Sequence, residues 1–410
     1  MQEKRPFGLS RNVTVAGFVS FFMDLSSEMI YPLVPLFLAN VIGVNKSLIG
    51  LIEGIAESTA SLLKVFSGWF SDRIGSRKWL MAFGYGISTL SRPIVALAST
   101  WQHVLTFRFI DRLGKGIRTA PRDAIIAEST DSKTLGKAFG FHRSMDTLGA
   151  VVGPAIAFGL LSLFANNFKL VFWLSMIPGV IAVLLIVFFI TEVKSGKRQA
   201  MVATPGASAP HKASDRPKLT FSHFDWRFKG FVAIATLFAI GNSSDVFLIL
   251  RAEQTGVSAP MIPILYLVFT LAYTFSAMPA GLAADRFGRK KVILIGLVLF
   301  AIVYLGFATV ATPLTVWLLF ALYGVFMGLT EGVQKAFLAT IIPAEFKATA
   351  FGIYNMCIGL ALLPASLIAG LLWDKVSPSA PFYFGAMMAG LSAMLFTGFI
   401  IATRQTTPSK

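Results

Sequence analysis

Long apolar segments alternate with short polar ones along almost the whole chain. Each apolar segment is long enough for a helix that crosses a bilayer, which needs about 20 residues. Helices are expected because hydrocarbon offers no water to satisfy the backbone. Prolines inside these segments (Pro32, Pro35, Pro154 and Pro364) are expected to kink helices rather than end them. Twelve spans fit the pattern, at residues 12–37, 45–70, 79–100, 102–128, 137–164, 168–191, 228–251, 259–283, 291–312, 314–342, 346–373 and 379–403.

Composition supports a polytopic membrane protein. Of the 410 residues, 55% are hydrophobic and 14% are charged, and the mean hydropathy is +0.71. A soluble domain carries about 25% charged residues. The single cysteine, Cys357, excludes an intramolecular disulfide and argues against a metal cluster, and four scattered histidines do not make a metal site. We therefore expect no metal and no cofactor.

A polar interval at residues 192–227 divides the apolar pattern in half. Its middle, from Ala203 to Ala213, is rich in Ala, Pro, Gly and Ser, which is typical of a flexible linker. We predict an N-terminal six-helix bundle at 1–191, a cytoplasmic linker at 192–227 and a C-terminal six-helix bundle at 228–410.

One charged, glycine-rich pattern occurs twice, each time between two apolar segments. Residues 68–77 and 281–290 both read Gly-x-x-x-Asp-Arg-x-Gly-x-Arg/Lys, and the two copies begin 213 residues apart, about half the chain. Such a segment cannot lie in hydrocarbon, so each copy is expected to form a tight loop at a membrane face. The repetition indicates two copies of one structural unit.

This pattern resembles the signature loop of the major facilitator superfamily of membrane transporters, which lies between the second and third helices of each six-helix half. The alternative is a generic basic loop placed by the positive-inside tendency. The resemblance implies an all-α membrane protein with twelve transmembrane helices in two pseudo-symmetric six-helix bundles. It also implies gating roles for the motif residues Gly68, Asp72, Arg73, Gly281, Asp285 and Arg286.

The basic residues predict the orientation. With both ends of the chain cytoplasmic, 23 Lys and Arg residues fall on cytoplasmic segments and four (Lys46, Lys169, Arg251 and Lys375) on outside loops. These inner loops account for much of the net charge of +16 without any nucleic acid. Compact loops favour a multi-pass protein of the bacterial inner membrane, acting as a monomer among membrane lipids.

Charges inside the predicted spans concentrate in the first half. Each costs at least about 2.5–3.5 kcal/mol on insertion scales, so it is expected to face a wet cavity or an opposite charge. Asp24 and Glu28 share one helical face with Ser27 and Tyr31. Together with Glu57 they place three acids near one depth, more than pairing requires. Because burial and pairing both move carboxylate pKa values, we predict that these three acids carry protons.

Two further motifs carry the resemblance. Residues 112–116 resemble the family's Arg-x-x-(Gln)-Gly motif, with Lys115 in place of glutamine, which implies that Arg112 takes part in proton transfer. The segment with Gly149, Gly153 and Pro154 resembles the Gly-x-x-x-Gly-Pro motif of the superfamily's antiporters, which favours efflux and adds these three residues to the gating set. Small residues also simply permit close helix packing.

The remaining polar residues of the spans are predicted to bind substrate. Basic groups in the inner half are expected to meet the acids around a central cavity, while the less charged second half supplies more of an apolar wall. Glu331 and Lys335, one turn apart, are positioned to pair with each other. The predicted substrate-binding residues are Tyr31, Lys115, Arg118, Arg122, Arg143, Asp146, Asn242, Asp245, Glu331, Tyr354 and Asn355.

The sequence therefore predicts a secondary transporter with a small-molecule substrate, working by alternating access. Proton-coupled export of a small organic compound fits best. Uptake of an organic anion drawn by Lys115, Arg118, Arg122 and Arg143 is an alternative, as are a lipid flippase and a sensor that binds ligand without moving it. Ion pairs that merely hold helices together would explain the same charges. No catalytic constellation indicates an enzyme.

Overall fold

The computed structural model describes residues 9–74, 76–130, 134–192, 224–342 and 347–405, and all regular structure in these ranges is helical. Side chains are described at the same positions except 64–74, 347–349, 404 and 405. The all-α membrane fold with twelve spans is confirmed. Five of these spans consist of two or three consecutive helical elements.

The first half contains six helical spans. The first is built from α1 (Arg11–Ile30), the short α2 (Val34–Leu36) and the π-helix η2 (Phe37–Ile42). The others are α3 (Lys46–Ile74), α4 with α5 (Arg77–Leu90, Arg92–Ala96), α6 (Trp101–Glu128), α7 (Leu135–Leu163) and α8 with α9 (Phe168–Leu174, Met176–Phe189).

The second half repeats this arrangement. Its first span is α11 (Trp226–Gly241) followed by α12 (Val246–Gln254), and its second begins with a 3-10 turn, η6 (Ala259–Met261), that leads into α13 (Ile262–Phe287). The remaining spans are α14 (Arg289–Thr309), α15 (Pro313–Thr340), α16 (Lys347–Lys375) and α17 (Ala380–Gln405).

Two predicted continuous helices are interrupted. Helix α1 ends at Ile30 and helix resumes at Val34, so Pro32 interrupts the helix locally, because proline has no N–H to donate, but the span continues to Ile42 as expected. The predicted span 228–251 breaks between Gly241 and Val246. The interrupted segment reads Gly-Asn-Ser-Ser-Asp. Glycine weakens a helix interior, and Asn, Ser and Asp side chains offer the backbone hydrogen bonds that compete with those of the helix. By contrast, Pro154 and Pro364 lie inside helices that do not end there.

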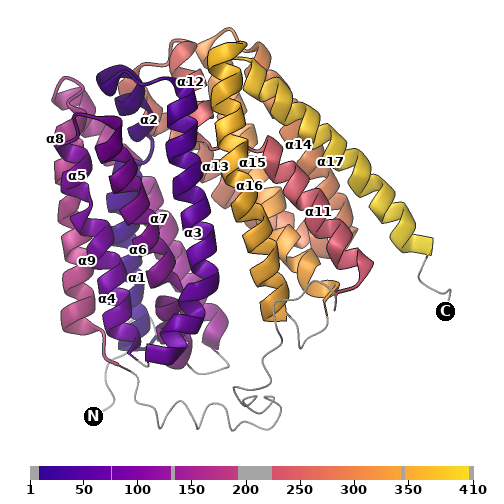
Figure 1. Ribbon diagram of the computed structural model, residues 1–410. Helices are drawn as coiled ribbons and strands as arrows, with labels where there is room; N and C mark the ends of the chain where they lie inside the picture. The colour runs from indigo at the N-terminus through magenta and orange to yellow at the C-terminus, as the bar shows by residue number, and fades with distance from the viewer. Residues whose placement is uncertain (1–8, 75, 131–133, 193–223, 343–346, 406–410) are drawn as a thin grey trace, which may run out of the picture.

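The two halves stand side by side (Figure 1). We call the end at which α1 begins and α17 ends the terminal end, and the other the opposite end. Helices α3 and α16 make the most extensive contact between the halves, close together at the opposite end and divergent toward the terminal end (Figure 1). The predicted linker lies mostly at 193–223, outside the described residues, so the domain boundaries stay a prediction.

Hydrogen bonds hold the halves together toward the opposite end. The Ser47 hydroxyl donates to the Asp374 carboxylate at 2.6 Å, and the Ser58 hydroxyl donates to the carbonyl of Gly359 at 2.7 Å. Asn40 donates to Glu253 at the same end. The described halves are thus closed at the opposite end and separated at the terminal end.

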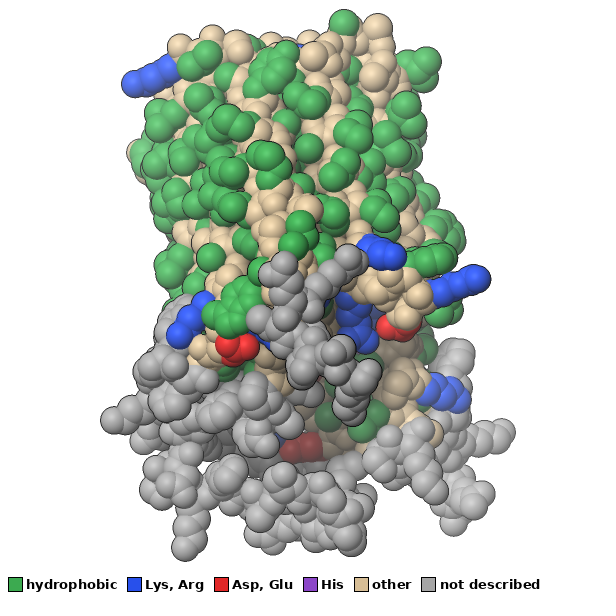
Figure 2. Space-filling view, turned by 90° about the vertical axis from the view of Figure 1, so that its right-hand side faces the viewer, with side chains coloured by type: hydrophobic (Ala, Val, Ile, Leu, Met, Phe, Trp, Pro, Cys, Tyr) green, Lys and Arg blue, Asp and Glu red, His purple; other side chains and the backbone are tan. Residues whose placement is uncertain are grey.

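The outer surface matches a lipid environment. Figure 2 shows apolar side chains over most of one face, with Lys and Arg side chains gathered near the terminal end. Length and apolar composition identify nine candidate membrane spans among the described residues. The three helical spans outside this set are α3, α4 with α5, and α6. Of these, α3 and α6 carry most of the charged side chains described below.

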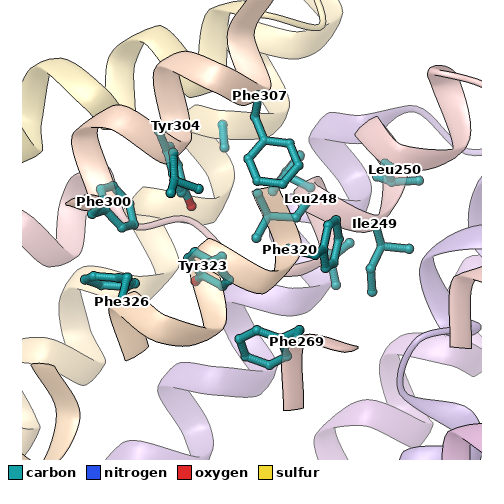
Figure 3. Packing of buried hydrophobic residues seen from close by; sticks show 14 of the residues in the cluster. Leu248, Ile249, Leu250, Phe269, Phe300, Tyr304, Phe307, Phe320, Tyr323 and Phe326 are labelled. Carbon is teal, nitrogen blue, oxygen red and sulfur yellow. The ribbon is translucent and has the colours of Figure 1, made fainter. Parts of the chain in front are cut away.

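Aromatic side chains pack against one another in the core of the second half (Figure 3). Phe300 stacks on Tyr304 with ring centroids 3.9 Å apart, and Phe269 stacks on Tyr323 at 5.4 Å. Such pairs add about 0.5–1.5 kcal/mol beyond the area they bury. This packing fixes Tyr323, whose hydroxyl reaches toward the break between α11 and α12.

Gly50 allows the close approach of α3 to α16. A Cβ at Gly50 would lie 2.2 Å from the carbonyl oxygen of Ser366, which is backbone and cannot move aside easily. We expect Gly50→Leu to destabilise this arrangement by about 1–3 kcal/mol through overpacking. Thermal unfolding of the purified protein in detergent would measure the change.

The control is Gly390→Leu in α17, where an added Cβ meets no atom within 4 Å. This variant should unfold at the wild-type temperature or above it. Equal unfolding temperatures for Gly50→Leu and wild type would contradict the contact between α3 and α16.

Candidate functional site

Two connected cavities lie between the halves. One has a volume of about 370 Å³ and the other, which extends further toward the terminal end, about 570 Å³. Both are lined by Asp24, Glu28, Lys115, Arg118 and Asp245, so they form one continuous space. Residues of both halves thus meet around a single polar chamber.

Helices α3 and α6 build an ion-pair network along one wall. Glu53 pairs with Arg108, and both side chains are nearly inaccessible, at 1% and 3% exposure. One turn further along, Glu57 pairs with Arg112 at 2.7 Å. The i, i+4 spacing on each helix brings both pairs to the same interface. The predicted proton-coupling residues Glu57 and Arg112 are therefore partners of each other.

A third buried pair continues the network. Arg92, at the start of α5, lies 3.5 Å from the Asp111 carboxylate of α6 and donates to the Ser27 hydroxyl of α1 at 3.1 Å. Sequence reasoning did not select Arg92, Asp111, Glu53 or Arg108 for the site. The available signal was that each is a charge inside a predicted span, which already requires a partner or a wet cavity.

Three cavity carboxylates differ from these paired ones. Among the described residues, no basic side chain lies within ion-pairing distance of Asp24, Glu28 or Asp245. The Glu28 Oε2 atom is buried and has no hydrogen-bond partner in the described part of the chain. Asp245 accepts a hydrogen bond from the Tyr323 hydroxyl at 2.7 Å. The three side chains are half-buried, and a carboxylate withdrawn from water without a cationic partner is costly when charged, so each of the three favours a proton or a cationic ligand.

The break between α11 and α12 presents Asp245 to the cavity. Asn242, Ser243 and Ser244 line the same space. Irregular backbone at membrane depth is tolerated where it lines a water-filled cavity. The interruption thus exposes polar groups that a continuous helix would bond internally. Asp245 thus lines the same cavities as Glu28 of the first half.

Aromatic side chains bridge the halves beside these acids. Tyr31 of α1 and Tyr266 of α13 lie 5.4 Å apart between ring centroids. The guanidinium carbons of Arg108 and Arg112 lie 5.4 and 5.9 Å from the centre of the Tyr31 ring, within the range of a cation–π contact. The predicted binding residue Tyr31 therefore joins the ion-pair network to the second half.

A second polar chain crosses between the halves nearer the terminal end. Arg143 of α7 lies 3.5 Å from Asp146 and donates to the Tyr273 hydroxyl of α13 at 3.2 Å. Tyr273 donates to Glu331 of α15 at 2.6 Å, and Lys335 donates to the other oxygen of that carboxylate at 3.0 Å. The expected pairing of Glu331 with Lys335 is present. Tyr273 was not among the predicted site residues.

The other predicted binding residues divide into two groups. Arg122, with Arg143, Asp146 and Glu331, lines the larger cavity, and Asn242 lines the smaller one. Tyr354 and Asn355 line neither cavity. The Tyr354 hydroxyl donates to Gln334 at 2.9 Å, and its ring lies parallel to Phe231 at 6.2 Å. The structure therefore gives Tyr354 a packing role.

The predicted gating residues Gly149, Gly153 and Pro154 are described, and they lie outside the walls of both central cavities. Gly149 and Gly153 let α7 approach α1, since added Cβ atoms would lie 2.4 Å from the Phe21 carbonyl oxygen and 2.8 Å from that of Leu25. Pro154 is buried beside them. This geometry matches close helix packing, and a gating role for the three stays a prediction.

The repeated motif, expected as a tight loop, is mostly helical: its second copy runs from the end of α13 through Gly288 into the start of α14. Asp285 and Arg286 are exposed at the terminal end, and Asp285 lies 3.4 Å from Arg289. Gly281 lines a crevice between α13 and α15. In the first copy, Gly68, Asp72 and Arg73 belong to α3, but their side chains lie outside the described ones. The gating role of the motif is a prediction.

Comparison with known families agrees with this architecture. The family model described as Major Facilitator Superfamily matches residues 16–249 and 230–410. The chain belongs to the major facilitator superfamily. The resemblance drawn from the repeated loop is therefore confirmed, and the chain is a membrane transporter of this superfamily.

Individual relatives extend over nearly the whole chain. An uncharacterized MFS-type transporter of Methanocaldococcus jannaschii is 37% identical over 393 residues, covering 94% of each chain. A homologue of the multidrug resistance efflux pump PmrA from Lactococcus lactis is 25% identical, covering 98% of this chain and 96% of its own. The crystal structure of a POT family transporter with 5-aminolevulinic acid has a TM-score of 0.78 at 13% identity over 99% of each chain, which shows the shared fold.

Breaking the buried pair in the α3–α6 wall should destabilise the protein. Glu53→Gln leaves the buried Arg108 guanidinium with only Glu57, which lies 3.8 Å away and is already paired with Arg112, and loss of one member of a buried pair costs about 3–5 kcal/mol. Equilibrium unfolding in mixed detergent would report this loss.

The double variant Glu53→Gln with Arg108→Gln removes both charges and should recover part of the lost stability. A double-mutant cycle isolates the coupling between the two residues. Additive losses for the two substitutions would show that the pair does not hold the wall together.

Proposed function

We propose that the protein exports a small organic compound in exchange for protons. The observation that carries this proposal is the set of three cavity carboxylates, Asp24, Glu28 and Asp245, which have no ion-pair partner among the described residues. They face a chamber that extends toward the terminal end, where the halves diverge. A carboxylate in this position can gain or lose a proton with the state of the chamber.

The exchange follows from the charge balance of the chamber. With Glu28 or Asp24 ionised, a buried negative charge favours either a bound cationic group or a state in which water reaches it. Protonation removes that charge and so favours the state in which the chamber is closed at the terminal end and open at the opposite end. Substrate and proton then stabilise different facing states, which is the requirement for obligatory exchange.

The paired acids take a different part in this scheme. Glu57 contacts Arg112, and its charge is balanced while that contact lasts. We propose that Arg112 sets the local field felt by Glu28, since both line the smaller cavity. The Lys115 ammonium lines the same space and is exposed to it. Lysine at this position adds a positive charge where the family motif has a neutral glutamine.

Export is favoured over uptake by two observations. The relative from Lactococcus lactis is named as a homologue of a multidrug efflux pump, and the chain carries the antiporter-like segment at Gly149, Gly153 and Pro154. Uptake of an organic anion is the second candidate. It is favoured by the basic lining of the larger cavity, where Lys115, Arg118, Arg122 and Arg143 all contribute.

We further propose that the terminal end faces the cytoplasm of a bacterial cell and that the protein works as a monomer in the inner membrane. The distribution of Lys and Arg supports this orientation. In this proposal, the partners of the protein are its small-molecule substrate, protons and the surrounding membrane lipids.

Proton flux in liposomes tests the proposal. Purified protein would be reconstituted with a pH-sensitive dye inside, and drugs and organic anions would be added in turn. We expect one class to change the dye signal in wild type and the signal to be lost in Asp24→Asn and in Glu28→Gln. In proton-coupled uptake, protons move in the same direction as the substrate. A dye signal of that sense, produced by organic anions, would establish uptake instead.

The control is Asp225→Asn, a carboxylate at the start of α11 that lies outside both cavities. Asparagine is an equally good helix N-cap, so this variant should fold and transport as wild type. Substrate transport that proceeds with no proton movement in wild type would contradict proton coupling. Ligand binding without transport would favour the alternative in which the protein is a sensor that binds ligand without moving it.

A further inference from the structure

A cavity separate from the central chamber lies at the terminal end of the second half. Its volume is about 420 Å³, and its wall comes from the end of α13, the start of α14 and the ends of α15 and α17. Its lining includes Arg289, Lys290 and Lys291, against a single carboxylate, Asp285. The described wall is therefore net positive, and neither central cavity shares any of these four residues.

Apolar groups complete the wall. Phe287, Phe337 and Ile400 line the same cavity, and 58% of the Phe287 surface is exposed. The Nζ atom of Lys290 lies 6.0 Å from the centre of the Phe337 ring, and it donates a hydrogen bond to the Thr403 hydroxyl at 2.6 Å. A ligand seated here would meet positive charge and hydrocarbon at the same time.

The backbone adds further donors at this position. Helix α14 spans 21 residues, and its N-cap, Gly288, has a φ of 96° and supplies no side-chain cap. The first N–H groups of a helix lack intrahelical acceptors and attract anions, particularly phosphate. The residues that carry the first N–H groups, Arg289 and Lys290, line the cavity, so side chains and backbone favour the same kind of ligand.

The depth of the cavity indicates the source of the anion. It lies where the apolar span Arg289–Thr309 begins, which is the level of the lipid headgroups. Figure 2 shows Lys and Arg side chains near this end, below a broad apolar surface. Basic pockets between transmembrane helices at this level are suited to acidic headgroups.

We propose that this cavity binds the phosphate of an anionic phospholipid. Arg289 and Lys291 contact the phosphate oxygens with the first N–H groups of α14, and the acyl chains lie against Phe287 and Ile400. Arg289 already lies 3.4 Å from Asp285, a contact in which both side chains are partly exposed. That contact offsets the one negative charge in the wall, so Asp285 does not repel the ligand.

Native mass spectrometry of the full chain in detergent tests the proposal. The protein would be titrated with phosphatidylglycerol, with phosphatidylcholine and, separately, with glycerol phosphate as the soluble source of the same group. We expect phosphatidylglycerol to bind at least about tenfold more tightly than phosphatidylcholine, because the wall carries three basic side chains against one carboxylate. Glycerol phosphate should bind far more weakly because it lacks the apolar contacts.

The variant Arg289→Gln with Lys291→Gln should lower the affinity for phosphatidylglycerol by about tenfold or more, while phosphatidylcholine binding stays unchanged. Lys229→Gln is the matched control, since Lys229 is exposed at the same end but does not line the cavity. If the double variant does not fold, Lys291→Glu replaces it, because Lys291 is exposed.

Equal affinity of wild type and variant for phosphatidylglycerol would overturn the site. Binding of glycerol phosphate as tight as that of the lipid would show an anion site and would overturn the assignment to a phospholipid. Neither outcome bears on proton exchange, which depends on different residues.

Discussion

The structure depends on one constraint, the cost of holding charge away from water. Helices α3 and α6 meet that cost by pairing, with Glu53 against Arg108 and Glu57 against Arg112. Each charge in this wall is balanced by its partner within the same half. The wall can therefore keep its structure while the halves move. Asp24, Glu28 and Asp245 are not paired in this way among the described residues. Their charge must be balanced by a proton, a ligand or water, and this requirement links binding to the state of the chamber.

The two halves meet this constraint with different devices. In the first half, continuous helices carry the charges, and i, i+4 spacing aligns them. In the second half, the helix itself is broken at Asn242–Asp245, and stacked aromatic rings hold Tyr323 against Asp245. The result is a carboxylate from each half facing one chamber, within two bundles that close at the opposite end through Asn40, Ser47 and Ser58.

Apolar length and the repeated loop were enough to predict the twelve spans, the superfamily and the pairing of Glu331 with Lys335. The faces of single helices were also predictable, because helical periodicity places Asp24, Ser27, Glu28 and Tyr31 together. Contacts between helices were not. Whether Glu57 meets Arg112 or Tyr273 meets Arg143 depends on packing that no local pattern encodes. The break after Gly241 was missed because apolar residues continue on both sides of Gly-Asn-Ser-Ser-Asp.

The central claim is that protonation of the cavity acids changes which end of the chamber is open. Paired spin labels on a Cys357→Ser background test it most directly, with one pair at Lys137 and Phe287 near the terminal end and another at Val41 and Val376 near the opposite end. All four positions are exposed. On acidification, the account predicts that one distance lengthens while the other shortens, and that Glu28→Gln reproduces this change in alkaline buffer. Distances that stay constant with pH and in Glu28→Gln would contradict the account.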